Sequence, residues 1–395
     1  MSLEVLPTPI DVIDVPDCVS ASSLGYWKGC LLKLIAGSMH DGSRLPSSPE
    51  AAAGTLVHRA LERLGQGSTE TPDEAFDAEY DVLQEELRAD PRRCHFSDLR
   101  AVLGSSRWNR LRARVATSDG GSIEPAWASL VAGGSADVTL HDVVGVERKL
   151  ESRRLRIRGR ADEIRRTGTN SFEVRDYKTG GVVDAEGIVR ESIALQLQAY
   201  GLMLLDMIPT AQVRLVVDDG SERDVAFDAA HRSAAEAHVE SITSRLPIGS
   251  VTAEDVATPG PGCWQCSIRH VCTAYLALAP VWWSSYPDDH SIPLDVWGTV
   301  TEIRDGSRKD VLLEDDAGRR TLVRGVSDRH SIDSDAGSIG RRLWFFGLES
   351  RGPRRGFDGR RYQPRAFHEL PRDGLERRAW MLQVFGNGEE VCGVR

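Results

Sequence analysis

The chain has 395 residues, of which 41% are hydrophobic, and a formal net charge of −10. This length and apolar content can bury a sizeable core and suggest two or three domains, whereas the acidic charge argues against indiscriminate nucleic-acid binding over the whole surface. No apolar run is long enough to cross a bilayer, and the first residues lack the basic and apolar regions of a signal peptide. We therefore expect a cytoplasmic protein with no membrane partner, whose seven cysteines are metal ligands or free thiols.

Helices are predicted in the first 118 residues. Ser20 to Ser23 resemble N-caps of a helix that would present Cys30 near its middle. A second helix, from about Pro49 to Gly65, places His58 on the face opposite its apolar side. Residues 72 to 118 have the pattern of one or two charged helices.

A β-hairpin is the most informative prediction. Two runs with β pattern, 157–164 and 172–178, flank a Gly/Asn/Thr turn at 167–170. The hairpin's centre of symmetry lies in this turn and places Asp162 opposite Asp176, about 5 Å apart at Cβ. Two like charges at that distance are destabilising unless a proton or a cation lies between them.

Lys178 follows Asp176 by two residues and shares its face of the strand. An aspartate that faces Asp-x-Lys can hold a hard divalent cation beside a cationic partner for phosphate. The hairpin therefore predicts a site for phosphodiester chemistry.

Basic residues are concentrated between Arg148 and Arg166. In a regular strand, Arg156, Arg158 and Arg160 would share the face of Asp162, unless a bulge at Gly159 changes this parity. The stretch is either a solvated edge strand or a phosphate-contacting approach to the metal. Glu147 and Glu151 lie on the strand that approaches Gly159, and either could be a further acidic residue of the site.

Three cysteines form the motif Cys263-x-x-Cys266-x5-Cys272, and Cys30 is a candidate fourth ligand far upstream. Four thiolates suit a cubane iron–sulfur cluster or zinc. Cys18 and Cys94 remain possible substitutes for Cys30.

The rest of the chain divides at about residue 285. A helix from about Gly187 to Met207 carries Gln196 and Tyr200 one turn apart, and further strands and a helix lead to the cysteine motif. Residues 290–395 contain short strands alone, which favours a small OB-like barrel. Its segment 351–362 combines arginines with aromatics, as in a loop that holds single-stranded nucleic acid; an exposed loop or a protein-docking arm is an equal alternative.

Together these motifs resemble the RecB-type branch of the PD-(D/E)XK nuclease superfamily, which includes AddB and the CRISPR-adaptation nucleases. The resemblance spans roughly residues 20 to 275 and rests on motifs that occur in the family's order: Gly54-x-x-x-His58, Gly159-x-x-Asp162, Asp176-Tyr-Lys-Thr-Gly180 and Gln196-x-x-x-Tyr200.

The resemblance implies an α/β fold: a restriction-endonuclease-like core with a helical insertion, extending over residues 1–285 and followed by the OB-like domain. It also implies a [4Fe–4S] cluster that clasps the ends of the core through Cys30 and the three later cysteines, with zinc as the alternative. Leu31 departs from the family, in which a proline often follows the first cysteine.

The implied activity is that of a Mg²⁺- or Mn²⁺-dependent deoxyribonuclease, an exonuclease or end-processing enzyme of DNA repair, recombination or antiviral defence. Its substrate would be single-stranded DNA or DNA with a free end. The resemblance assigns His58, Asp162, Asp176 and the backbone carbonyl of Tyr177 to the metal, and makes Lys178 the residue that orients the attacking water. It assigns Gln196 and Tyr200 to positioning the DNA strand, and the basic stretch described above adds Arg158 and Arg160 as candidate DNA-binding residues.

Two other functions fit the sequence. One is a catalytically silent DNA-binding or scaffold subunit of a helicase–nuclease assembly, although the intact set of active-site residues argues against it. The other is a zinc-stabilised interaction module. The chain contains no Walker A motif, so a helicase or defence-system partner would be a separate polypeptide.

Overall fold

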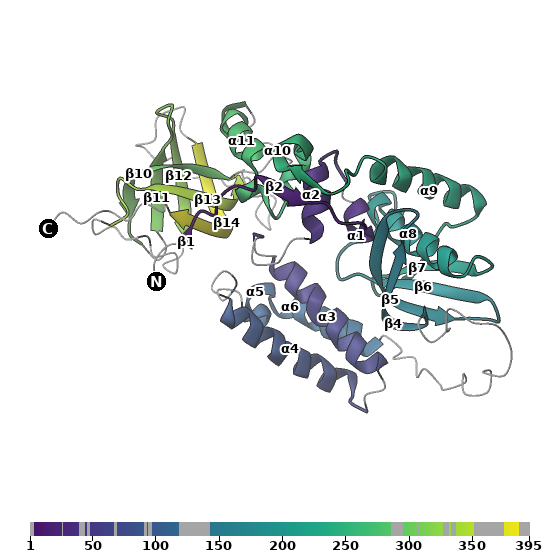
Figure 1. The fold of residues 1–395 in the computed structure, drawn as a ribbon. Helices are drawn as coiled ribbons and strands as arrows, with labels where there is room; N and C mark the ends of the chain where they lie inside the picture. Colours follow the sequence, from purple (N-terminus) through teal and green to yellow (C-terminus); the bar gives the residue numbers. More distant parts are fainter. Residues whose placement is uncertain are drawn as a thin grey trace.

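The structure is a computed structural model that describes residues 4–25, 27–38, 44–45, 48–66, 69–90, 93, 97–117, 143–285, 295–306, 309–326, 332, 337–350 and 375–386. A β-barrel and a mixed α/β body lie at opposite ends, the cysteine motif lies between them, and a group of helices lies below (Figure 1). None of the described helices is both long and apolar enough to cross a membrane.

The central sheet of the α/β body has six strands: β3 (Val19–Ser20), β4 (Gly145–Ser152), β5 (Ile157–Arg166), β6 (Ser171–Tyr177), β7 (Gln212–Asp218) and β8 (Glu222–Val225). β5 and β6 are antiparallel, which confirms the predicted hairpin and its turn. β6 and β7 are parallel and are joined by helix α8 (Glu191–Met207), on which α9 (Ala229–Thr243) packs. The sheet is therefore mixed, as expected for an α/β core.

Helix α8 begins four residues later than the sequence suggests. Val183 pairs with Val189 in an isolated bridge, and Asp184 Oδ1 accepts hydrogen bonds from the amides of Glu186 and Ile188. These local bonds compete with the helix and keep residues 183–189 in a turn.

The prediction of one helix around Cys30 is wrong. Two short helices, α1 (Ala21–Leu24) and α2 (Leu31–Ile35, followed by the 3₁₀ turn Ala36–Ser38), are separated by Gly29, which has a left-handed φ of 91°. A residue with this φ ends a helix, so Cys30 lies at the N-cap of α2.

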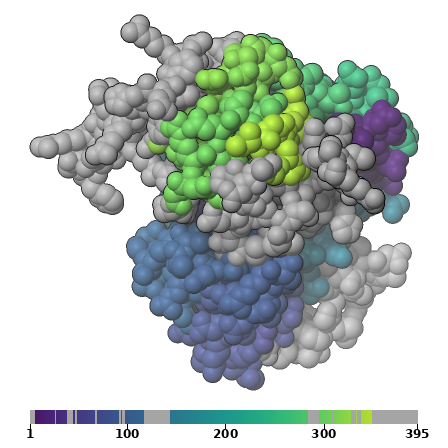
Figure 2. Space-filling model, turned by 90° about the vertical axis from the view of Figure 1, so that its left-hand side faces the viewer, coloured from purple at the N-terminus to yellow at the C-terminus, as the bar shows by residue number. Residues whose placement is uncertain are grey.

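The predicted insertion, residues 72–118, forms three helices, not one or two: α4 (Pro72–Ala89), α5 (Leu99–Leu103) and α6 (Ser105–Thr117). These helices pack with α3 (Pro49–Gly65), which carries His58, and the four together are called the insertion below. Two of its helices begin as the sequence dictates: Ser48 caps α3 ahead of Pro49, and Thr71 forms a capping box with Glu74 ahead of α4. The predicted bounds of α3 are confirmed. The insertion has a hydrophobic core of its own, separate from that of the sheet, and forms a lobe below the barrel in Figure 2.

The cysteine motif lies in a segment of short elements: β9 (Ser250–Thr252), α10 (Ala253–Val256), the 3₁₀ turns η5 (Pro261–Gln265) and η6 (Arg269–Val271), and α11 (Thr273–Ser285). The N-terminal strand β2 (Val12–Asp14) pairs with β9, and β3 then enters the central sheet. The beginning of the chain is thus tied both to the cysteine segment and to the sheet.

The C-terminal strands close into a barrel: β10 (Val296–Arg304), β11 (Lys309–Glu314), β12 (Arg320–Val326), β13 (Arg342–Ser350) and β14 (Leu375–Gly386). Around the barrel the order is β10, β11, β12, β14, β13 and back to β10, with β12 and β14 parallel and the other pairs antiparallel. The first described strand, β1 (Glu4–Val5), also pairs with β14. The arginine-rich segment 351–362 lies outside the described residues.

A buried ion pair joins the barrel to the cysteine segment. Asp295, which is 1% exposed and directly precedes β10, accepts hydrogen bonds from Arg269 Nε at 2.6 Å, Tyr275 OH at 2.7 Å and the amide of Gly347 at 2.8 Å. Arg269 also donates from Nη1 to the carbonyl of Cys266. Two charged groups can be buried here because each is surrounded by hydrogen-bond partners.

We predict that Asp295→Ala destabilises the protein by about 3–5 kcal/mol, because it leaves the Arg269 guanidinium buried without its partner. Chemical denaturation measures the change. Asp316→Ala is the matched control, since it removes an aspartate whose pair with Arg342 lies on the barrel surface, where solvent screens it. Equal effects of the two substitutions would contradict the prediction.

Candidate active site

The hairpin brings two carboxylates together. Glu163 pairs with Arg175 and Arg166 with Phe172, and the same register places Asp162 opposite Asp176, as the sequence predicts. Asp162 Oδ2 accepts a 2.6 Å hydrogen bond from the amide of Tyr177. Asp176 is 1% exposed, and its burial, together with the nearby charge of Asp162, raises its pKa to about 6.

A chain of polar side chains surrounds Asp176. Lys178 Nζ lies 2.8 Å from Asp176 Oδ2 and donates to Gln196 Oε1 at 3.2 Å. Gln196 Nε2 in turn lies 3.2 Å from Asp176 Oδ1 and 3.0 Å from Tyr200 OH. Gln196 and Tyr200 are buried, and both come from the face of α8 that covers the sheet. The two helix residues therefore lie behind the carboxylate.

Gly159 makes room for Tyr200. A β-carbon at this position would lie 2.5 Å from Tyr200 Cε1, closer than packed atoms can approach. The glycine three residues before Asp162 thus lets the tyrosine ring pack directly on the backbone of β5. This contact gives a physical reason for the spacing Gly159-x-x-Asp162.

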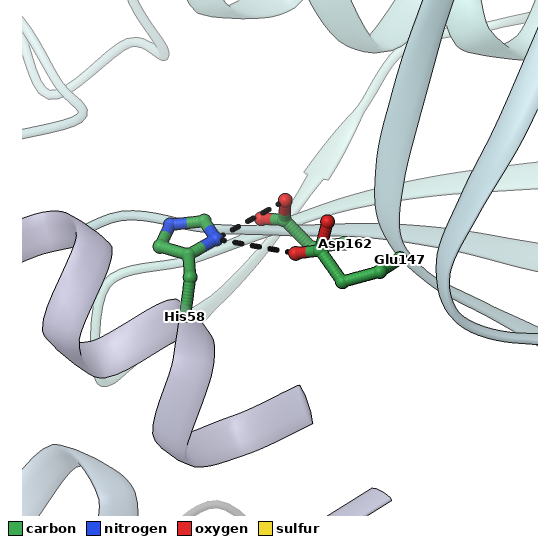
Figure 3. A group of neighbouring side chains, drawn as sticks. All are labelled: His58, Glu147 and Asp162. Atoms are coloured by element: carbon green, nitrogen blue, oxygen red, sulfur yellow. Dashed lines mark ion pairs between the residues drawn. The ribbon is translucent and has the colours of Figure 1, made fainter. Parts of the chain in front are cut away.

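His58 reaches the site from α3, as Figure 3 shows. Its Nδ1 lies 3.3 Å from Asp162 Oδ1 and 3.8 Å from Glu147 Oε1. Although burial opposes the change, the proximity of these two carboxylates raises the pKa of His58 to about 10. Without a cation, a proton on the imidazole balances the charge of these acidic residues; a metal ion bound at this nitrogen would have to displace that proton.

Glu147 is the site residue that the sequence left undecided. In the register of β4 with β5 it lies opposite Asp162, whereas Glu151 lies opposite Arg158. Glu147 has a left-handed φ of 52°, which is strained for a residue with a side chain, and such strain is concentrated at functional sites. Both glutamates lie on the strand that approaches Gly159, so only the strand register distinguishes them.

The donor set fits a hard divalent cation. One atom from each of His58, Glu147 and Asp162 lies within 4.8 Å of the others. In addition, Asp176 Oδ2 is buried and accepts no hydrogen bond of good geometry despite its proximity to Lys178. Carboxylate oxygens with one imidazole suit Mg²⁺ and Mn²⁺.

The arginines of β5 differ from one another in their surroundings. Arg158 and Arg160 are exposed, and Arg160 Nη1 lies 3.3 Å from Glu147 Oε2. The prediction that Arg156 joins them is wrong: it precedes the strand with a φ of 54°, and its guanidinium donates to the carbonyls of Asp17, Leu246 and Pro247. Gly159 does not bulge the strand in its pairing with β4.

The cysteine segment brings Cys30 close to the three later cysteines. The amide of Thr258 donates to Cys30 Sγ and that of Gly260 to Cys263 Sγ, both at 3.4 Å. Burial raises the pKa of the Cys266 thiol to about 12, so a thiolate here requires a compensating cation. Cys18 lies apart, against the carbonyl of Ser152 in β4, and Cys94 lies outside the described residues.

We predict that Gly159→Ala costs about 1–3 kcal/mol of stability and displaces the ring of Tyr200, because the added carbon has no space. Thermal or chemical denaturation measures the cost, and Gly337→Ala, whose β-carbon would meet no atom within 4 Å, is the control. Tyr200→Leu should relieve part of the penalty in the double variant. Additive effects of the two substitutions would show that the contact is not the cause.

Comparison with known proteins places the chain in a family. No curated protein matches it in a sequence search. Residues 19–273, well over half of the chain, match the PD-(D/E)XK nuclease superfamily, and the matched range contains the sheet, the helical insertion and the cysteine motif. The chain belongs to the PD-(D/E)XK nuclease superfamily.

Proposed function

We propose that this protein is a RecB-type nuclease that hydrolyses DNA with a divalent metal ion at the hairpin. Members of the superfamily are generally metal-dependent nucleases that act on DNA. The observation that carries the proposal is the pair Asp162 and Asp176 with Lys178 beside it, since two opposed carboxylates are costly unless they serve a cation. Single-stranded DNA or a free DNA end is the proposed substrate.

His58, Asp162 and Asp176 are the proposed metal ligands, with the backbone carbonyl of Tyr177. The position of Glu147 supports adding it to this set. A bound Mg²⁺ or Mn²⁺ would polarise the phosphate and lower the pKa of the attacking water. Lys178, next to Asp176, would orient that water or offset charge that grows on the phosphate.

The roles proposed for DNA contact differ among four residues. Arg158 and Arg160 are exposed on β5, and Arg158 is about 13 Å along the strand from Asp162. They remain candidates for phosphate contacts. The burial of Gln196 and Tyr200 and their link to Asp176 support a different role, in which they hold the carboxylate and Lys178 in place.

The four cysteines are proposed to bind a structural [4Fe–4S] cluster. A tetrahedral zinc site needs sulfurs about 3.8 Å apart, given a Zn–S bond of about 2.3 Å. Within the described residues, no three cysteine sulfurs lie within 4.8 Å of one another, which favours a larger cluster over zinc. Amide donors to Cys30 and Cys263 would stabilise the thiolates of either centre.

The barrel is proposed to be an OB-like nucleic-acid-binding domain. A five-stranded closed barrel with parallel third and fifth strands favours this fold. Several arginines of its strands lie beside carboxylates, among them Arg320 beside Glu314 and Arg342 beside Asp316. Their neutralised charge favours the arginine-rich segment 351–362 as the DNA-binding part, and the docking of a protein partner is the alternative.

We predict that Asp176→Asn abolishes cleavage yet raises the melting temperature of the metal-free protein. The carboxylate is needed for the metal, whereas the fold disfavours its charge, as its raised pKa indicates. Cleavage of end-labelled single strands and duplexes with Mg²⁺ and with Mn²⁺ measures the first effect and calorimetry the second. Lys178→Met should also abolish cleavage.

Asp224→Asn is the matched control for this experiment, because it makes the same change on the exposed edge strand β8 of the same sheet. It should leave cleavage intact. Full activity of both Asp176→Asn and Lys178→Met would refute the nuclease assignment and favour the silent scaffold subunit.

We predict that protein purified without oxygen contains iron and sulfide in equal amounts, and that Cys266→Ala and Cys30→Ala lose both. The cluster would close a loop of more than two hundred residues, so these variants should also be far less stable. Elemental analysis and absorption spectra provide the measurement, with Cys18→Ala as the control that keeps its iron. Zinc without sulfide would instead support the zinc-stabilised module.

A further inference from the structure

The core of the helical insertion is completed by a residue of the catalytic strand. Side chains from all four helices of the insertion form this core, including Leu56 and Val57 of α3 and Leu111 and Val115 of α6. Among the described residues, Tyr177 of β6 is the one member from outside the insertion. The insertion therefore docks on the end of the strand that carries Asp176.

Tyr177 is fixed to the sheet independently of this core. Its hydroxyl donates a 2.6 Å hydrogen bond to Glu163 Oε2, and Glu163 directly follows Asp162. Tyr177 itself lies between Asp176 and Lys178 in sequence. The ring that closes the insertion's core is thus bound to both strands of the hairpin.

Arg114 of α6 makes the polar connection between insertion and sheet. Its Nη1 lies 2.8 Å from Asp218 Oδ1, and both side chains are 9% exposed. Its Nη2 donates to the backbone carbonyl of Asp218 at 3.1 Å, and its guanidinium carbon lies 5.3 Å from the centre of the Tyr177 ring. The amide of Lys178 donates to the same Asp218 carbonyl at 2.9 Å. The backbone carbonyl of Asp218 therefore accepts hydrogen bonds both from Arg114 of the insertion and from the amide of Lys178, the proposed catalytic lysine.

His58 depends on this docking for its position. It lies on α3, and α3 and α6 pack against each other through the same core that Tyr177 closes. Asp162 and Glu147, by contrast, are held by the sheet. The 3.3 Å contact between His58 Nδ1 and Asp162 Oδ1 thus connects the insertion with the sheet, and each of these two parts has a hydrophobic core of its own.

We infer that Arg114 is a positioning residue of the metal site: by binding Asp218 and stacking on Tyr177 it holds the insertion so that His58 completes the set of ligands. The inference rests on the proposed metal-dependent function. The contacts of Arg114 with Asp218 and Tyr177 involve none of the proposed ligand side chains, and it acts through the orientation of α3. Metal affinity is the property it controls.

Titration calorimetry with Mn²⁺ alone tests the inference in the full chain, with and without His58→Gln. Arg114→Met should weaken Mn²⁺ binding roughly 10- to 100-fold, the usual effect of removing a residue that orients ligands. Arg114→Lys should restore part of the affinity, because a lysine can pair with Asp218 but cannot also form the second bond and the stack. If Arg114→Met does not fold, as judged by circular dichroism, Arg114→Lys carries the test.

Arg112→Met is the matched control. Arg112 lies on the same helix and pairs with Asp73 and Asp77 of α4, so its contacts stay within the insertion. This variant should bind Mn²⁺ within about twofold of the wild type, since the orientation of His58 is kept.

The His58→Gln background separates positioning from a general loss of structure. If Arg114 acts through His58, Arg114→Met should weaken Mn²⁺ binding little further once the imidazole is gone. Equal weakening in both backgrounds, or wild-type affinity of Arg114→Met, would overturn the positioning role alone. Wild-type affinity of the single variant His58→Gln would overturn the proposed metal site, and the positioning role with it.

Discussion

The opposition of Asp162 and Asp176 across one hairpin is the constraint on which the active site depends. Two carboxylates this close repel each other, and the inner one is buried, so the fold has to supply positive charge and hydrogen-bond donors around them. Lys178 supplies charge, His58 supplies an imidazole that binds either a proton or a cation, and Gln196 and the amide of Tyr177 supply donors. The acidic pair is thus the physical reason why most of these groups lie close together.

The groups that stabilise this pair of carboxylates come from three parts of the chain. The sheet supplies the carboxylates, α8 covers one of them, and the insertion brings His58 from a body with its own core. The insertion is anchored by buried polar groups, Arg114 and Asp218, together with the ring of Tyr177. Because an ion pair with little exposure has defined geometry and is costly to break, it suits a contact that has to position a ligand.

The cysteine segment has a comparable role between the α/β body and the barrel. It receives the N-terminal strand β2, lies beside Cys30, and binds the barrel through Arg269 and Asp295. The first described strand extends this connection, since β1 belongs to the barrel sheet although it precedes the whole nuclease region. A cluster bound at this junction would therefore affect both bodies.

The sequence by itself determined several local elements and their chemistry, although it misplaced the helix around Cys30 and the start of α8. The hairpin with its register and the bounds of α3 follow from turn residues, strand periodicity and capping, which act over a few positions. The tertiary structure decided what depends on contacts distant in sequence: that Glu147 and not Glu151 faces Asp162, and that Gln196 lies behind Asp176. Such choices follow from strand pairing and the docking of separate bodies, whose energies come from surfaces that no local pattern encodes.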